Sequence, residues 1–233
     1  MSLMEERGLD AEGFDRLLAD RWSCRGFRTD EVPAEVLTDV AQAAQRTASW
    51  CNTQPWHTHL VTGTARAELA ERLYASASSG AFSADLEMPS DYRGVYQERR
   101  RDAGYRLYAA LGIAREDREA RALQMLENYR FFGAPHVAIV TSDRNQGLYA
   151  HIDVGAYVAN LMHAAFARGV ASCPQAAIAM QSDVVREFLD LPEDRVVVCG
   201  VALGYADEDH PANRARMPRA EVGDALTFVT ETP

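Results

Sequence analysis

The segment RVVVCGVALGY, residues 195–205, lies in the longest nearly apolar run of the chain, which extends from Val196 to Ala206. That run is about half of the ~20 residues that a membrane-spanning helix requires. Consecutive Val, Ala and Leu side chains make both faces of an extended segment apolar, as in strands that are covered on both sides. We therefore predict a buried strand at the centre of a sheet.

Hydrophobic periodicity predicts helices on either side of this strand. Pro33 suits a first helical position, and an apolar stripe follows it. Residues 76–94 are rich in Ser, Gly, Asp and Pro, which predicts an excursion over the surface, an insertion or a lid. The expected helices cover residues 9–19, 33–44, 63–74, parts of 95–130, 152–166 and 182–189. Ser182 is expected to cap the last of them. Further strands are expected at 56–62 and 136–141, and a strand that pairs at a sheet edge at 225–230.

The longest expected helix has one face of small and apolar residues and ends at Gly169. Their size predicts close packing against a neighbouring helix. The face consists of Ile152, Gly155, Ala156, Ala159, Met162, His163 and Phe166.

Composition places the 233 residues in one globular domain, residues 1–233, without repeats or an interdomain linker. The formal net charge of −10 disfavours nucleic acid and anionic membranes as partners. All 24 basic residues are Arg, so the absence of Lys excludes a GxxxxGK[ST] phosphate loop, pyridoxal chemistry and Schiff-base aldolases.

Charges at the amino terminus argue against a signal peptide, and four scattered Cys residues argue for free thiols. We expect a cytoplasmic protein.

Common catalytic signatures are absent from the sequence. It contains no GxSxG elbow, no HExxH and no GxGxxG turn between a strand and a helix. His57 and His59 share one face of a strand, but two ligands are too few for a zinc site. We therefore predict no metal site and no Rossmann dinucleotide site.

Arg21, Ser23 and Arg25 have an RxSxR spacing, which in an extended backbone sends all three side chains to the same side. Two guanidiniums and a hydroxyl can bind a phosphate dianion through several charge-assisted hydrogen bonds. A loop of surface salt bridges is the alternative.

Three other segments suggest a ligand site. SWCNTQPW, residues 49–56, combines two indoles, two amides and a Pro, which suits a planar heterocycle with polar edges as well as it suits a Trp-anchored turn. SCPQAA, residues 172–177, is expected between two helices, with free backbone N–H groups that either address a ligand or belong to a simple turn. NRARMPR, residues 213–219, adds a cationic tail cluster.

Four motifs follow one another along the sequence: RWSCRGF, ASWCNTQPW, GVASCPQAA, and ALGYAD with ANRARMPR. In these motifs and in their order, the sequence resembles the FMN-dependent nitroreductase family over nearly its whole length. NTQPW is the most specific of these motifs. The resemblance implies an α+β sandwich with a mostly antiparallel central sheet flanked by helices, and an intertwined homodimer with an FMN in each of two interface clefts. It also makes residues 76–100 the variable region that shapes the substrate pocket.

The resemblance assigns cofactor-binding roles residue by residue. The segment of Arg21, Trp22, Ser23 and Arg25 matches the one that binds the FMN phosphate and ribityl chain. The loop with Ser49, Trp50, Asn52 and Gln54 matches the one that borders the flavin from the partner subunit. Pro174, Gln175 and Ala176 match the stretch whose backbone lies along the isoalloxazine edge, and the tail cations are Arg216 and Arg219, with Arg214 as an alternative to either.

The implied function is an NAD(P)H oxidoreductase that reduces nitroaromatic or quinone-type acceptors by a ping-pong hydride mechanism. No side-chain acid or nucleophile is required, so no catalytic residue is expected. Two alternatives remain: another flavin reaction on the same fold, such as reductive dehalogenation or flavin destruction, and a non-catalytic flavin-binding protein.

Overall fold

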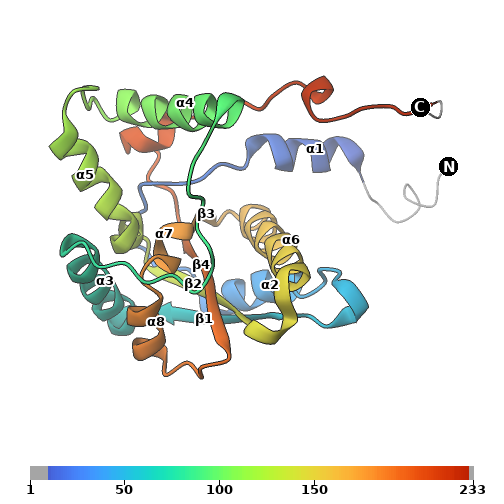
Figure 1. Ribbon diagram of the computed structural model, residues 1–233, viewed down its shortest axis with the longest axis horizontal. Coiled ribbons are helices and arrows are strands. Elements are labelled where there is room, and N and C mark those ends of the chain that lie inside the picture. Colours follow the sequence, from blue (N-terminus) through green and yellow to red (C-terminus); the bar gives the residue numbers. More distant parts are fainter. Residues whose placement is uncertain (1–9, 231–233) are drawn as a thin grey trace.

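The computed structural model describes residues 10–230 and contains a four-stranded antiparallel sheet (Figure 1). The strands are β1 (Trp56–Thr62), β2 (His136–Asp143), β3 (Ala171–Gln175) and β4 (Arg195–Gly204), in the order β1-β2-β4-β3. Strand β4 therefore lies inside the sheet, paired with β2 and β3, as its apolar composition predicts. The α+β class and the antiparallel sheet expected from the sequence are confirmed.

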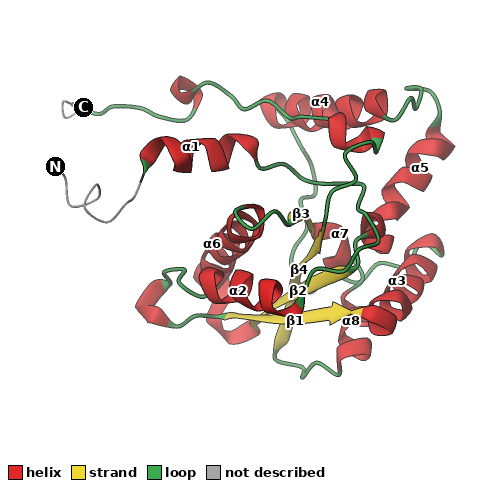
Figure 2. Ribbon diagram, turned by 180° about the vertical axis from the view of Figure 1, so that it is seen from behind, coloured by secondary structure: helices red, strands yellow, loops and turns green. Residues whose placement is uncertain are grey.

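Eight α-helices surround this sheet in the described part of the chain, and Figure 2 shows them from behind. Helices α2 and α6 pack on the face of Ala138 and Val140, whereas α3, α7 and α8 pack on the face of Val137 and Ile139. Neighbouring residues of β2 thus contribute to opposite cores, as alternation along a strand requires. The helices are α1 (Ala11–Asp20), α2 (Ala34–Ala44), α3 (Gly63–Ser78), α4 (Gly94–Ala110), α5 (Arg118–Leu126), α6 (Gly147–Phe166), α7 (Ala176–Ala179) and α8 (Ser182–Leu189).

The buried face of α6 differs from the predicted one. Val154, Tyr157, Val158 and Leu161 face the core, whereas Ile152 is 57% exposed and the other members of the predicted face are exposed or partly exposed. Because α6 is apolar on most of its circumference, periodicity alone does not identify the core side. Ile152, Gly155 and Ala156 are left exposed within one chain, whereas Met162 packs against the core and Phe166 contacts Trp22.

Three local predictions are also corrected. Residues 172–175 belong to strand β3, which pairs with β4, and residues 176–177 begin α7, so the SCPQAA segment is no simple turn. The tail piece at 225–230 forms no strand in the described chain. Pro33 and Gln181 are the residues that precede α2 and α8, so Ser182 is the first helical residue and not the cap.

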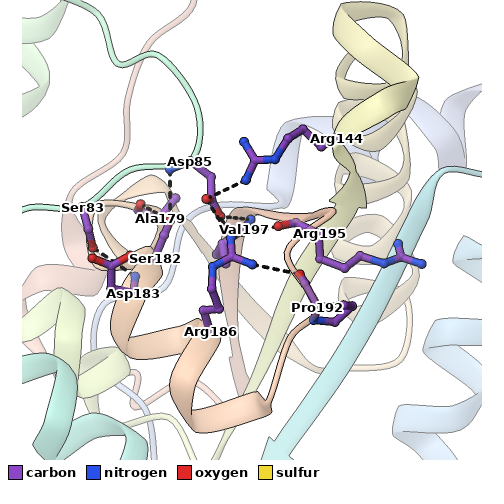
Figure 3. A network of polar contacts seen from close by, with 10 residues as sticks. All are labelled: Ser83, Asp85, Arg144, Ala179, Ser182, Asp183, Arg186, Pro192, Arg195 and Val197. Carbon is purple, nitrogen blue, oxygen red and sulfur yellow. Dashed lines mark hydrogen bonds and ion pairs between the residues drawn. The ribbon is translucent and has the colours of Figure 1, made fainter.

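The excursion between α3 and α4 has no regular element but is fixed at one point (Figure 3). The Asp85 carboxylate accepts hydrogen bonds from Arg186 Nη2 at 2.6 and 2.7 Å, from Val197 N at 2.8 Å and from Arg144 Nη2 at 3.2 Å. Ser83 pairs with main-chain atoms of Met180 and Ser182. This Asp85 network attaches the excursion to α8 and to Val197 of β4, a residue that does not pair with β3.

Helices α1 and α4 lie beyond the β3 side of the sheet, where the carboxy-terminal segment also runs (Figures 1 and 2). Neither contains a buried residue. No helix among the described residues is long and apolar enough to cross a membrane.

Candidate functional site

A cavity of about 420 Å³ lies between the end of α1, the segment that follows it and the carboxy-terminal segment. Four arginines line it, two from each segment: Arg21 and Arg25, and Arg216 and Arg219. We call this the arginine cavity. Its other lining residues are Leu18, Ala19, Asp20, Trp22, Ser23, Ala215 and Met217.

Extended backbone places the RxSxR side chains together. Ser23 forms a β-bridge with Ser172, and Cys24 N donates to Ser172 O at 2.9 Å. Arg21, Ser23 and Arg25 all line the cavity, as alternation along an extended segment predicts, while Cys24 is fully buried. Trp22 departs from this alternation, because it lines the cavity as well. The geometry predicted for the RxSxR spacing is present.

These four arginines have no carboxylate partner among residues 10–230. Asp20 lines the cavity but forms no ion pair. Arg21 Nη1 is buried without a hydrogen-bond partner. Burial, and after it the nearby charge of Arg219, lowers the pKa of Arg21. Such uncompensated positive charge favours an anionic ligand, and the buried guanidinium nitrogen of Arg21 is a hydrogen-bond donor that remains available for it.

Trp22 gives the cavity a flat wall. The guanidinium carbon of Arg216 lies 4.2 Å from the centre of the indole ring, and Phe166 contacts the indole edge to ring at 5.9 Å. Its Nε1 is buried and has no partner. An aromatic face beside cations suits a ligand that carries both an anion and a less polar body.

Asn213 was not predicted from the sequence. Its side chain is 5% exposed and bonds to the main chain of the RxSxR segment, where Arg25 N donates to Oδ1 at 2.8 Å. Only the cationic character of NRARMPR pointed to this segment. Of the three tail arginines, Arg216 and Arg219 line the cavity and Arg214 does not.

The SCPQAA segment lies next to the arginine cavity through the contact of Cys24 with Ser172, but it does not line that cavity. Pro174 and Ala176 are exposed. The Gln175 side chain points into the core, where Nε2 donates to Asn128 O at 2.7 Å. Of the three side chains at 174–176, that of Gln175 is therefore withheld from a ligand, whereas Pro174 and Ala176 lie at the surface.

The SWCNTQPW loop is not brought to the arginine cavity within one chain. Trp50 N donates to Asp153 of α6 at 3.0 Å, and the loop lines a separate cavity of about 200 Å³. Cys51, Asn52 and Gln54 have φ values of 51°, 55° and 48°. Non-glycine residues in this left-handed region store strain, which is typical of functional loops.

The cysteines supply no nucleophile to the site. All four are free thiols, as predicted. Burial raises the pKa of Cys173 to about 11 and that of Cys199 to about 12. Both are neutral thiols at physiological pH, and a neutral thiol is a poor nucleophile.

Comparison with known proteins identifies the family. The model of the nitroreductase family matches residues 18–205. The chain is 41% identical to nitroreductase NfnB of Mycolicibacterium smegmatis, over 94% of this chain and 93% of that protein. It is 36% identical to a 4-nitrobenzoate reductase of a Nocardioides species, over 94% and 90% of the two chains.

The fold agrees with this similarity. The crystal structure of the FMN-dependent nitroreductase NfnB from Mycobacterium smegmatis in complex with NADPH superposes with a TM-score of 0.90 at 40% identity, over 94% of this chain and 99% of that chain. A nitroreductase with bound FMN from Desulfitobacterium hafniense shares the fold, with a TM-score of 0.61. The chain belongs to the nitroreductase family.

Proposed function

We propose that this protein is an FMN-dependent NAD(P)H oxidoreductase that reduces nitroaromatic compounds. Relatives over more than nine-tenths of the chain are named as nitroreductases, and the structure at 40% identity is described as FMN-dependent and in complex with NADPH. Quinone-type acceptors and a ping-pong order of reaction are part of the proposal. No side chain of the cavity supplies a nucleophile.

The arginine cavity is the observation that carries the proposal. It offers four guanidiniums, and one of them has a buried nitrogen without a hydrogen-bond partner. Among the described residues, no carboxylate forms an ion pair with any of the four. The FMN phosphate is a dianion that would supply the missing partners. Arg21, Arg25, Arg216 and Arg219 would hold it, with the Ser23 hydroxyl as a further donor and Trp22 as a wall for the ribityl chain.

The backbone of residues 174–176 would border the isoalloxazine ring. The segment is adjacent to the cavity, and the Gln175 side chain is engaged elsewhere, so the polar groups that the segment offers to a ligand belong to its main chain. FMN, when bound, supplies the hydride chemistry between the nicotinamide and the acceptor. Cationic side chains and free N–H groups of this chain would stabilise negative charge that develops on the cofactor.

We further propose an obligate homodimer in which the SWCNTQPW loop of one subunit borders the flavin of the other. Three observations support it. The loop lies away from the arginine cavity of its own chain. Trp50 and Tyr149, which contact each other, are 64% and 60% exposed. The part of the small-residue face of α6 formed by Ile152, Gly155 and Ala156 lacks a cover, and faces of this kind occur at obligate interfaces. The cytoplasmic location stays a prediction from the sequence.

The visible absorption spectrum of the purified protein tests cofactor and reaction together. We expect a flavin spectrum that anaerobic NADPH bleaches and that 4-nitrobenzoate then restores. A bound flavin that NADPH cannot bleach would favour a non-catalytic binding protein, and bleaching without turnover of nitroaromatics would favour another flavin reaction. Either result, or no flavin after reconstitution with FMN, would overturn the proposal.

A further inference from the structure

The two halves of the arginine cavity come from opposite ends of the chain and meet at one neutral side chain. Asn213 accepts from Arg25 N at 2.8 Å, and its Nδ2 donates to Gly26 O at 2.7 Å and to Asp207 O at 2.8 Å. Asn213 is 188 positions from Arg25 and 187 positions from Gly26 in the sequence, whereas Asp207 is nearby. The side chain is 5% exposed, so water does not replace these bonds readily.

Asn213 also contacts the other pair of arginines, because Arg216 Nη1 donates to its main-chain carbonyl. One residue thus bonds through its side chain to the Arg25 backbone and through its backbone to the Arg216 side chain. The junction is tightly packed. A Cβ at Gly26 would lie 2.1 Å from Cγ of His210, so only glycine lets the two segments approach this closely.

We propose that Asn213 is a positioning residue that assembles the four-arginine surface before the anion binds. This inference rests on the proposed function, in which the cavity takes the FMN phosphate. Nearby cations repel one another, as the effect of Arg219 on the pKa of Arg21 indicates. An uncharged clamp holds them together without neutralising them, whereas a carboxylate at this position would compete with the ligand.

The effect of this clamp is specific to the phosphate. Asn213 does not line the cavity, and apart from its bond to Asp207 O its side chain bonds to the segment that carries Arg21 and Arg25. Riboflavin has the same ring and ribityl chain as FMN but lacks the phosphate. The ratio of the two dissociation constants therefore reports on the arginine surface, while the stability of the apo-protein reports on the fold.

The test measures the binding of FMN and of riboflavin to apo-protein, together with its thermal unfolding. For Asn213→Ala we expect FMN to bind about tenfold or more weakly and riboflavin to change by less than about threefold. Asn213→Ser, which keeps a small polar group, should lose less affinity for FMN than Asn213→Ala does. It serves as the second variant in case the alanine variant does not fold.

Gln181→Ala is the matched control. Gln181 is also a buried amide, 2% exposed, that accepts from Ser76 Oγ at 2.6 Å and donates to Ala81 O at 2.7 Å, away from the arginine cavity. We expect it to lower the apo melting temperature and to leave the ratio of dissociation constants unchanged. An unchanged ratio in the folded Asn213 variants, or an equal loss for both ligands, would overturn the role of Asn213. A wild-type protein that does not prefer FMN to riboflavin would instead overturn the proposed phosphate site.

Discussion

Two arginine clusters of this molecule, the Asp85 network and the arginine cavity, differ in whether the described chain supplies their counter-charge. In the Asp85 network, Arg144 and Arg186 contact one carboxylate whose side chain is only 12% exposed (Figure 3). In the arginine cavity, none of the four guanidiniums forms an ion pair with a carboxylate of the described chain. Three of them bond instead to main-chain carbonyls: Arg25 to Ser23, Arg216 to Asn213, and Arg219 to Met217 and Pro218.

This difference separates a structural site from a binding site. Removing charged groups from water is unfavourable unless an opposite charge compensates. Asp85 compensates within the chain and, through Val197 N, also attaches the excursion to β4. In the arginine cavity no carboxylate of the described residues pairs with the guanidiniums, of which Arg21 and Arg25 are half-buried and Arg216 and Arg219 are exposed. We propose that a ligand supplies their counter-charge. The following predictions alter one cluster or the other.

The largest expected effect is that of Ser23→Asp, which adds a carboxylate to the arginine cavity. Two unit negative charges about 4 Å apart at an effective dielectric constant of about 20 repel by about 4 kcal/mol, so a new carboxylate beside the phosphate dianion should raise the dissociation constant by roughly a thousandfold or more. The apo-protein should not lose stability, because the new carboxylate pairs with the arginines. FMN titration and apo urea unfolding check both points. Ser23→Asn, of similar size and uncharged, is the control, and equal FMN affinities in the two variants would contradict the account.

Asp85→Ala should have the opposite pattern. It leaves Arg186 without its partner and Val197 N without an acceptor, and breaking a largely buried pair of this kind costs roughly 2–4 kcal/mol of unfolding free energy. FMN affinity should hold, because the network shares no residue with the arginine cavity. Asp91→Asn is the control. Its ion pair with Arg93 at 2.6 Å is exposed, and its loss should cost less than about 1 kcal/mol in urea unfolding. Similar losses in the two variants would show that Asp85 is not a buried anchor.

Arg25→Ala should weaken FMN binding more than it weakens the fold. Loss of one charge-assisted bond to phosphate is worth about 1.5–3 kcal/mol, or about tenfold to a hundredfold in dissociation constant. Arg214→Ala is the matched control, because Arg214 belongs to the same tail cluster but does not line the cavity. FMN titration of the apo-proteins is the measurement, with apo melting alongside. Unchanged FMN affinity in the Arg25 variant would show that Arg25 is not a phosphate ligand and would favour the alternative of a surface salt-bridge residue.

The smallest effect concerns a buried base that bonds to no carboxylate. His136 Nε2 accepts from Val32 N at 2.9 Å, and burial lowers the pKa of His136. The unfolded chain therefore binds this proton more readily than the folded chain does. The contribution of His136 to stability is complete above the unfolded pKa of about 6.5 and is lost as the pH falls through the folded value.

His136→Gln isolates that contribution. Glutamine still offers an oxygen to Val32 N but does not titrate, so the variant should lose less stability than the wild type between neutral and mildly acidic pH. Urea unfolding at several pH values measures this difference. Identical pH dependence in both proteins would contradict the assignment.

The sequence predicted what depends on local pattern. Strand β4 was recognisable because both faces of residues 195–204 are apolar, and the RxSxR spacing was informative because extended backbone places alternate side chains together. The core side of α6 was not predictable, since its exposed face is as apolar as its buried one. Asn213 acts on main-chain atoms almost 190 residues away, and no local pattern encodes such a contact.

The central claim is that the arginine cavity takes its counter-charge from the phosphate of FMN. A crystal structure of the FMN-loaded protein tests it most directly. We expect phosphate oxygens within hydrogen-bond distance of Arg21, Arg25, Arg216 and Arg219, with the Trp50 loop of a second subunit against the ring. A phosphate bound elsewhere, with these four guanidiniums still without an anion, would contradict the account.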